Sequence, residues 1–197
     1  MISEEKNMAG KVFFLGDPHL KHKKIPKSRG FETVDEHDIA VIDSIFQTCG
    51  RDDSLIITGD TCFGGPDAFI KLMREGAARN LPKMHGKVPD DWRPNFNIKV
   101  TQGNHDSFSM LMQLFLSEWI SKFCSLFEYK MARSDGSVSK VIVTHVPVLL
   151  DRWEYNVHGH WHSRKVGNPD YLNSSWDHLR RPATFEELLQ LHNGESL

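Results

Sequence analysis

Cysteine is scarce in this sequence, and the few that occur form no pattern. The 197 residues include three cysteines, Cys49, Cys62 and Cys124, an odd and widely spaced set without a CxxC pair. This set argues against a disulfide framework and against a zinc site built from thiolates. Because a protein without a disulfide pattern suits a reducing compartment, we expect a cytoplasmic location.

Long apolar segments and a strong net charge are also missing. No run of about 18 apolar residues occurs, and no apolar segment follows the charged residues near Met1, so we expect neither a membrane-spanning helix nor a targeting signal. The formal net charge of -2 excludes a general attraction to nucleic acid or to a membrane surface. With 39% hydrophobic residues, the chain is typical of a single globular domain over residues 1–197.

The first half of the chain alternates short apolar runs with amphipathic segments. Thr33 and Glu36 have the spacing of a capping box, which begins a helix that ends before Gly50. Further predicted elements are strands at 11–15, 55–58 and 97–100 and helices at 67–79 and 110–119. Strand–helix alternation of this kind is typical of parallel strands joined by right-handed crossovers.

The second half is rich in strands. The runs 126–131 and 140–146 flank an Asp135-Gly136 turn that leaves no room for a helix, which predicts a β-hairpin. Further predicted elements are strands at 155–161 and 171–175 and a short final helix that begins with the capping box Thr184-Phe185-Glu186-Glu187. The two halves together indicate the mixed α/β class.

Two segments without periodicity are candidates for contacts with a substrate. Residues 21–29 form a basic loop with Lys21 and Lys23, and its composition fits both a solvated surface loop and a loop that attracts an anion. Residues 80–96 predict a loop insertion near the functional site, with Trp92 and Arg93 as candidate substrate contacts. A plain surface insertion fits that composition equally well.

Several of the predicted strands end in residues with a carboxylate, carboxamide or imidazole side chain. Asp17, Asp60, Asn104, His145 and His160 all stand at strand ends, and the chain has eleven histidines. Singly, such residues are usually turn residues, helix caps or surface groups. Together they indicate chemistry, because binding crevices in α/β sheets lie at the carboxyl ends of the strands.

Spacing adds two more candidate ligands. Residues two apart in a strand point to the same side, so Asp17 pairs with His19 and His160 with His162. Carboxylate, imidazole and carboxamide groups without a thiolate suit divalent ions such as Mn²⁺, Fe²⁺ or Zn²⁺. Because seven ligands exceed the needs of one tetrahedral ion, we predict two metal ions that share a bridging carboxylate.

Five motifs stand in the order Gly16-Asp17-Pro18-His19, Gly59-Asp60, Gly103-Asn104-His105-Asp106, His145 and Gly159-His160-Trp161-His162. In this order, they resemble the motifs of the calcineurin-like metallophosphoesterase family, and look most like those of its short, single-domain bacterial and phage-type members. The resemblance spans residues 16–162. It implies a four-layer α-β-β-α sandwich, in which two mixed sheets pack face to face with helices outside.

The resemblance also implies a role for each site residue. One metal would be held by Asp17, His19 and His162, the other by Asn104, His145 and His160, and Asp60 would bridge them. Manganese is the favoured ion, with iron, zinc, nickel or cobalt as alternatives. A metal-bridging hydroxide would attack phosphorus in line, while His105, oriented by Asp106, would stabilise the phosphoryl group or protonate the leaving oxygen.

The expected substrate is a phosphodiester, either a small molecule or a nucleotide. A nuclease or nucleotide-processing activity, a phosphomonoesterase and a non-catalytic protein-binding scaffold remain as alternatives, and self-association stays open. The sequence departs from the plainest family pattern at His158, which we expect on the surface or in contact with a metal ligand, and in the long spacing from Asp60 to Asn104.

Overall fold

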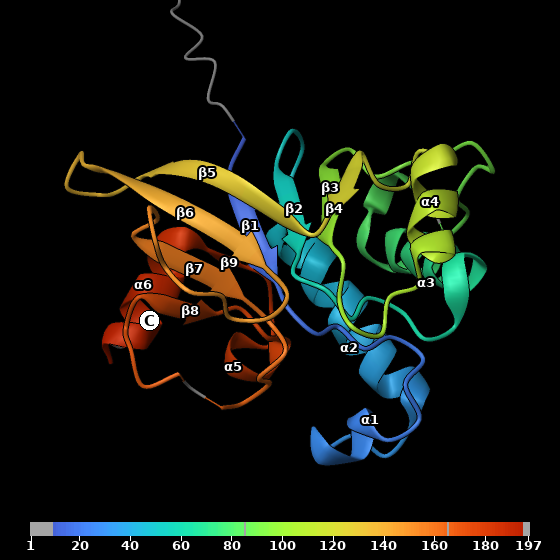
Figure 1. The fold of residues 1–197 in the computed structure, drawn as a ribbon. Coiled ribbons are helices and arrows are strands. Elements are labelled where there is room, and N and C mark those ends of the chain that lie inside the picture. The colour runs from blue at the N-terminus through green and yellow to red at the C-terminus, as the bar shows by residue number, and fades with distance from the viewer. Residues whose placement is uncertain (1–9, 85, 165, 195–197) are drawn as a thin grey trace, which may run out of the picture.

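A five-stranded sheet carries the first half of the chain (Figure 1). The computed structural model describes residues 10–84, 86–164 and 166–194, so the segment near Met1 lies outside the described residues. In order across the sheet, the strands are β4 (Lys122–Cys124), β3 (Asn97–Thr101), β2 (Ser54–Ile57), β1 (Val12–Leu15) and β9 (Ala183–Thr184). The first four strands are parallel and β9 is antiparallel, which confirms the parallel strands predicted for 11–15, 55–58 and 97–100.

Three helices cover one face of this sheet. They are α2 (Val34–Thr48), α3 (Gly65–Asn80) and α4 (Phe108–Leu116). Their apolar side chains share one core cluster with Phe13, Leu55 and Ile98 of the sheet. The capping box at Thr33 and Glu36 forms as predicted, since each side chain accepts a hydrogen bond from the other residue's backbone N–H.

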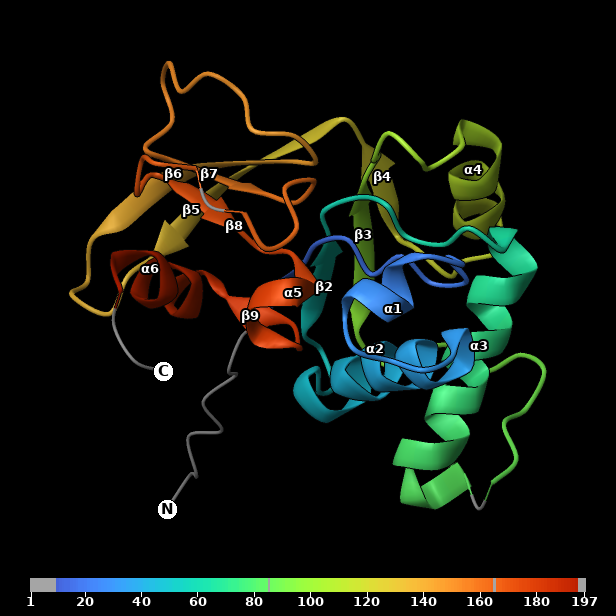
Figure 2. The same cartoon turned by 90° about the horizontal axis from the view of Figure 1, so that it is seen from below.

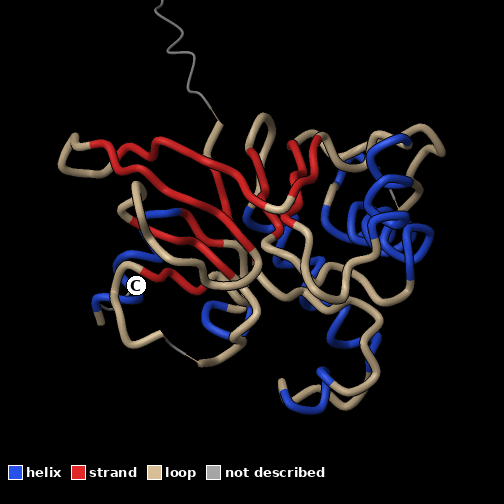
Figure 3. Tube along the Cα trace, viewed as in Figure 1, coloured by secondary structure: helices blue, strands red, loops and turns tan. Residues whose placement is uncertain are grey.

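A four-stranded sheet carries the second half. Its strands are β5 (Leu126–Ala132), β6 (Val138–Thr144), β7 (Tyr155–His158) and β8 (Tyr171–Asn173), in that order across the sheet. β5 and β6 form the predicted antiparallel hairpin, whereas β6, β7 and β8 are parallel. Figure 3 shows the strands in the centre and upper left of the view, with most of the helices on the right.

The two sheets share a second core cluster. Phe14 and Ile56 point away from the helices of the first sheet and lie in the same cluster as Val143 and Val157 of the second. Alternate residues of β1 and β2 therefore serve different cores, as the two-residue period of a strand requires. The fold is mixed α/β, with two sheets and six α-helices in the described ranges.

The last helix packs at the edge of both sheets. α6 (Phe185–Asn193) contacts β8, β9 and β1, and its capping box at Thr184 and Glu187 forms as predicted. Viewed from below, α6 and the one-turn helix α5 (Trp176–Leu179) lie beside β9, on the side of the second sheet (Figure 2). No helix in the part of the chain that the structure describes is long and apolar enough to cross a membrane.

The segment 80–96 lies at the amino-terminal ends of the strands, which does not fit the role predicted for it beside the site. It leads into the amino-terminal end of β3, where Asn95 accepts a hydrogen bond from Asp52 just before β2, and it includes a 3-10 turn, Pro82–Met84. Trp92 packs against Phe46 and Trp119 at the first core, with ring centroids 6.2 and 6.0 Å away. The predicted metal ligands follow the carboxyl ends of the strands, at the opposite end of the sheet, so the prediction that this insertion borders the site is wrong.

Candidate metal centre

The loops that follow β1 and β2 run side by side at the carboxyl edge of the first sheet. Asp17 donates its backbone N–H to Gly59 O at 3.3 Å, and His19 donates its own to Asp60 O at 3.0 Å. Leu20 continues the pairing with Thr61 O at 3.2 Å. The backbone thus places three of the predicted ligands together.

The ligand side chains converge through unusual backbone conformations. Positive φ angles occur at five of the seven predicted metal ligands: Asp17, His19, Asp60, His160 and His162. Residues other than glycine adopt this region at a cost, and such strain gathers at functional sites. The prediction that Asp17 with His19, and His160 with His162, form pairs along a strand is wrong. β1 ends at Leu15 and β7 ends at His158, so all four residues lie in the loops that follow.

Two motif glycines allow this close approach. A Cβ atom on Gly103 would stand 2.3 Å from both the backbone nitrogen and Oδ1 of Asp60. One on Gly59 would stand 2.3 Å from Nδ1 of His145. A side chain at either position would therefore displace a candidate ligand.

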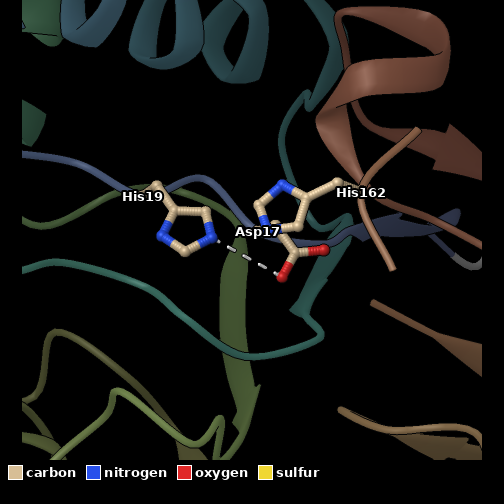
Figure 4. A group of neighbouring side chains, drawn as sticks. All are labelled: Asp17, His19 and His162. Carbon is tan, nitrogen blue, oxygen red and sulfur yellow. Dashed lines mark ion pairs between the residues drawn. The ribbon is translucent and has the colours of Figure 1, made fainter. Parts of the chain in front are cut away.

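Asp17, His19 and His162 form the first ligand group. One ligand atom from each lies within 4.8 Å of the others. The two imidazole rings stack at 4.8 Å between centroids, and Nε2 of His19 is 3.9 Å from the Asp17 carboxylate. Figure 4 shows both rings turned toward that carboxylate.

The second group consists of Asp60, Asn104, His145 and His160. His145 Nδ1 lies 2.8 Å from Thr58 O. A carbonyl only accepts, so Nδ1 carries the proton of the neutral ring and Nε2 has a free lone pair.

This lone pair faces two oxygen atoms and one ring nitrogen of His160. His145 Nε2 is 2.7 Å from Asn104 Oδ1, 3.5 Å from Asp60 Oδ1 and 3.2 Å from His160 Nδ1. Oxygen and nitrogen lone pairs repel at these distances unless a proton or a cation lies between them. The arrangement fits a divalent ion bound to these atoms.

Asp60 connects the two groups. Its Oδ2 lies 3.7 Å from His19 Nε2, and its Oδ1 lies 3.5 Å from His145 Nε2. A carboxylate with one oxygen toward each group has the geometry of a bridging ligand. All seven predicted metal ligands are therefore brought together.

His19 fits a metal ligand for a further reason. Both of its ring nitrogens are buried and lack a hydrogen-bond partner in the described structure. Burial lowers the pKa of His19 to about 2, with nearby cationic groups acting in the same direction, and burial also raises the pKa of Asp17. A buried neutral imidazole without a partner is costly as a structural group but suited to bind a cation.

Asp177 and Arg29 form a supporting ion pair that the sequence did not reveal. The Arg29 guanidinium donates to Asp177 at 3.1 and 2.6 Å and to the backbone oxygen of Asp17 at 2.8 Å. Asp177 in turn lies 3.4 Å from His162 Nδ1. The Asp177 hydrogen bond raises the pKa of His162, and although burial opposes it, hydrogen bonds from His162 and Arg29 lower the pKa of Asp177.

Consequently, the basic segment 21–29 does not behave as a solvated loop throughout. Arg29 is buried, and residues Ile25–Ser28 form a short helix, α1. Lys21 is close to His19 in sequence, but its ammonium pairs with Asp35 at 2.8 Å and Asp38 at 3.4 Å. Lys23 is exposed.

His105 and Asp106 separate after β3. His105 is exposed, and its ring lies 5.1 Å from that of Phe63 and 6.3 Å from that of His19. The Asp106 carboxylate instead accepts hydrogen bonds from the backbone of Thr61 at 2.8 Å and of Gly103 at 3.0 Å. The expectation that Asp106 orients His105 is therefore wrong. Within the described residues, the hydrogen bonds of the Asp106 carboxylate join the loop after β2 to the loop after β3.

Two other histidines differ from the sequence reading. His158, expected on the surface or in contact with a metal ligand, is completely buried, and its Nδ1 lies 2.7 Å from Gly159 O. His22 was not selected, yet its ring lies 5.4 Å from that of His19 and 4.4 Å from that of Phe63. Its Nδ1 accepts from the backbone of Lys24 and Ile25 at 3.0 and 3.1 Å, so Nε2 carries the proton of the neutral ring.

The remaining candidate substrate contacts lie elsewhere. Arg93 stacks over Trp119 at 4.9 Å and donates to Ser117 O at 3.1 Å, next to Trp92 at the amino-terminal edge of the sheet. The prediction that Trp92 and Arg93 contact a substrate at the metal centre is wrong. Only the folded chain reveals this, because both residues stand just before a strand whose other end carries Asn104.

Comparisons with known proteins show a fold and no family. No protein-family model matches the chain, and no curated protein matches it. Among solved structures, the chain is similar to AQ665 of Aquifex aeolicus, a protein of unknown function, with 15% sequence identity and a TM-score of 0.61. The similarity covers 92% of this chain and 99% of that one. At this identity it shows a shared fold alone.

Proposed function

We propose that the protein is a phosphoesterase that works with two divalent metal ions and prefers a phosphodiester. The observation that carries this proposal is the convergence of seven carboxylate, imidazole and carboxamide ligands in two groups joined by Asp60. Electron-pair donors that face one another, with Asp17, His19, Asp60 and His145 buried among them, suit a pair of cations better than a structural role. Phosphoryl transfer is the chemistry that such pairs of ions commonly perform.

The proposal includes membership of the calcineurin-like metallophosphoesterases and their sandwich of two sheets. The five motifs in family order support it, as does the core that both sheets share. α2, α3 and α4 over the first sheet correspond to one outer helical layer, while α6 lies at the sheet edge.

Each residue has a role in this proposal. Asp17, His19 and His162 would hold one ion, and Asn104, His145 and His160 the other, with Asp60 shared. Bound there, the ions would neutralise the phosphoryl oxygens and lower the pKa of the attacking water. Manganese is favoured, with iron, zinc, nickel and cobalt as alternatives, because the ligands include no thiolate.

The chain itself orients these ligands. The Thr58 carbonyl holds the His145 tautomer that leaves Nε2 free, and Asp177 contacts the ring nitrogen of His162 that faces away from the ligand group. Such outer contacts fix ring orientation and strengthen binding. His105, exposed beside Phe63, would donate a proton to the departing oxygen.

The first test is hydrolysis by metal-stripped protein, with Mn²⁺, Zn²⁺, Ni²⁺, Co²⁺, Fe²⁺ and Mg²⁺ added back separately. We expect bis-p-nitrophenyl phosphate to be cleaved faster than p-nitrophenyl phosphate, with two ions bound per chain. Asp60→Asn should abolish both the cleavage of the diester and the binding of two ions, because it removes the negative charge that the two ions would share. Asp43→Asn is the matched control, since Asp43 pairs with Arg79 on the helical side. Two bound ions without hydrolysis of either ester would refute the proposal.

His105 needs a separate test, because p-nitrophenolate leaves readily without a proton. His105→Ala should reduce cleavage of a phenyl ester far more than cleavage of a p-nitrophenyl ester, since phenol has a pKa of about 10. General acid catalysis is worth about 10²–10⁴ in rate. An equal loss for both leaving groups would assign His105 to phosphoryl stabilisation instead.

The alternatives have lost their particular support. A nuclease was suggested by the basic segment and by Trp92 with Arg93, but Arg29 is paired with Asp177 and the other two residues lie at the far edge. A scaffold without activity would not need seven convergent ligands. A monoesterase is distinguished by the paired assay above.

A further inference from the structure

An apolar pocket adjoins the second ligand group. It has a volume of about 430 Å³ and lies between the ends of β3, β5 and β6, with Gly103, Asn104, Leu126, His145, Val146 and Val148 among its lining residues. Two of these are proposed metal ligands. A phosphoryl group on the metal centre would therefore place one of its substituents at the mouth of this pocket.

The surface of the pocket is mostly apolar. Leu126 and Val146 are 44% and 42% exposed. Two polar side chains of the lining are engaged elsewhere: Thr144 Oγ1 donates to Val146 O at 2.6 Å, and Gln102 Nε2 donates to Asp106 O at 3.0 Å. The exposed Ser125 adds one hydroxyl to the lining. A sugar or a charged group would lose most of its water contacts here with little replacement, whereas a hydrocarbon would gain from burial.

The pocket and His105 lie on different sides of the site. His105 is absent from the pocket lining, and its ring instead lies 5.1 Å from that of Phe63. If His105 protonates the leaving oxygen, the leaving group departs on the Phe63 side. The substituent that stays on phosphorus is then the one next to Leu126 and Val146.

We propose that this pocket binds the retained substituent of the substrate, and that this substituent is an alkyl or aryl group. The inference rests on the proposed phosphodiesterase function and adds its substrate class: a phosphodiester with an apolar retained group. During hydrolysis water supplies the new P–O bond and the bond to the leaving oxygen breaks, while the retained ester stays intact in the pocket. Volumes of roughly 300–1,000 Å³ are typical of small-molecule sites, so a hexyl or phenyl group fits.

The test compares p-nitrophenyl phosphodiesters whose second ester is methyl, butyl, hexyl, phenyl or thymidine-5′-yl, with Mn²⁺ present. Burial of each methylene should raise kcat/KM by roughly fourfold until the pocket is filled. Leu126→Asn should remove most of this gain, so that the hexyl compound is turned over little faster than the methyl compound. Val138→Asn is the matched control, because Val138 is equally apolar, 57% exposed and at the far end of the same hairpin.

Binding is measured separately from turnover. Calorimetric titration of the Mn²⁺-loaded protein with methylphosphonate and hexylphosphonate should show the hexyl compound binding more than tenfold tighter, with the difference lost in Leu126→Asn. Tighter binding without turnover of any diester would support the pocket and refute the phosphodiesterase. Turnover and binding that do not depend on chain length would refute the pocket alone. A thymidine diester preferred over the hexyl diester would also overturn it, in favour of a nucleoside site.

Discussion

Replacing Asp177 by alanine should destabilise the protein and weaken its metal binding together. The Asp177 carboxylate accepts two hydrogen bonds from Arg29, whose side chain is 1% exposed, and lies 3.4 Å from His162 Nδ1. The substitution leaves a buried guanidinium without its counter-charge. It also leaves His162 without a contact that holds its ring.

The magnitude follows from the bonds that are lost. Hydrogen bonds to charged groups contribute about 1.5–3 kcal/mol each, and breaking a buried ion pair costs about 3–5 kcal/mol. Arg29 keeps the backbone oxygen of Asp17 at 2.8 Å as an acceptor, so we expect the lower end, about 3 kcal/mol. For a chain of this size, that lowers the Tm by roughly 6–12 °C. Loss of the ring contact should reduce metal affinity by about 10- to 100-fold.

Urea unfolding in the presence of EDTA measures the free energy of unfolding without bound metal. Titration of Mn²⁺ into metal-stripped protein measures the affinity for the ion. Asp177→Asn keeps an acceptor for Arg29 and should cost less than alanine in both assays. Asp43→Ala serves as control, because its pair with Arg79 is partly exposed and should be worth under about 1 kcal/mol. If the free energy of unfolding of Asp177→Ala lay within about 1 kcal/mol of that of the unaltered protein, or if the variant bound Mn²⁺ equally well, the role assigned to the Arg29–Asp177 pair would be wrong.

Three further results are expected. Gly103→Ala should lower the bound metal below two ions per chain, measured by elemental analysis of purified protein, because its Cβ would press on Asp60 at 2.3 Å. Glu187→Gln should cost stability only at higher pH: burial raises the pKa of Glu187, but its hydrogen bonds with Arg181 and Thr184 together outweigh burial and lower the pKa. The Glu187 carboxylate therefore stabilises the folded protein above about pH 4.3, the pKa of an unperturbed glutamate. This stabilisation is lost as the pH falls through the lower pKa that Glu187 has in the folded protein, so the unfolding curves of Glu187→Gln and of the unaltered protein should converge in acid. Trp92→Ala should lower the Tm but leave the kcat of the folded fraction unchanged, since Trp92 packs in the first core away from the ligands; a large fall in kcat would contradict the placement of segment 80–96.

Much of the secondary structure was predictable because its signals are local. Both capping boxes and the hairpin around Asp135-Gly136 are set by residues a few positions apart. The parallel pairing of the first half joins distant residues, but the alternation of strands and helices along the chain predicts it. The seven ligand candidates were also recognisable, since their types and their places at strand ends are properties of the chain order. α1 and β4 were missed because short elements carry too little periodicity.

The sequence alone determined which residues could bind metal, because carboxylate, imidazole and carboxamide groups after successive strands meet at one sheet edge in a parallel arrangement. Only the tertiary structure decided what surrounds them. Arg29 and Asp177 come from distant parts of the chain, the pocket at Leu126 forms where the two sheets meet, and Trp92 lies at the opposite edge from the ligands. Such contacts join positions far apart in sequence, and they depend on how the sheets and helices pack rather than on any local pattern of residues.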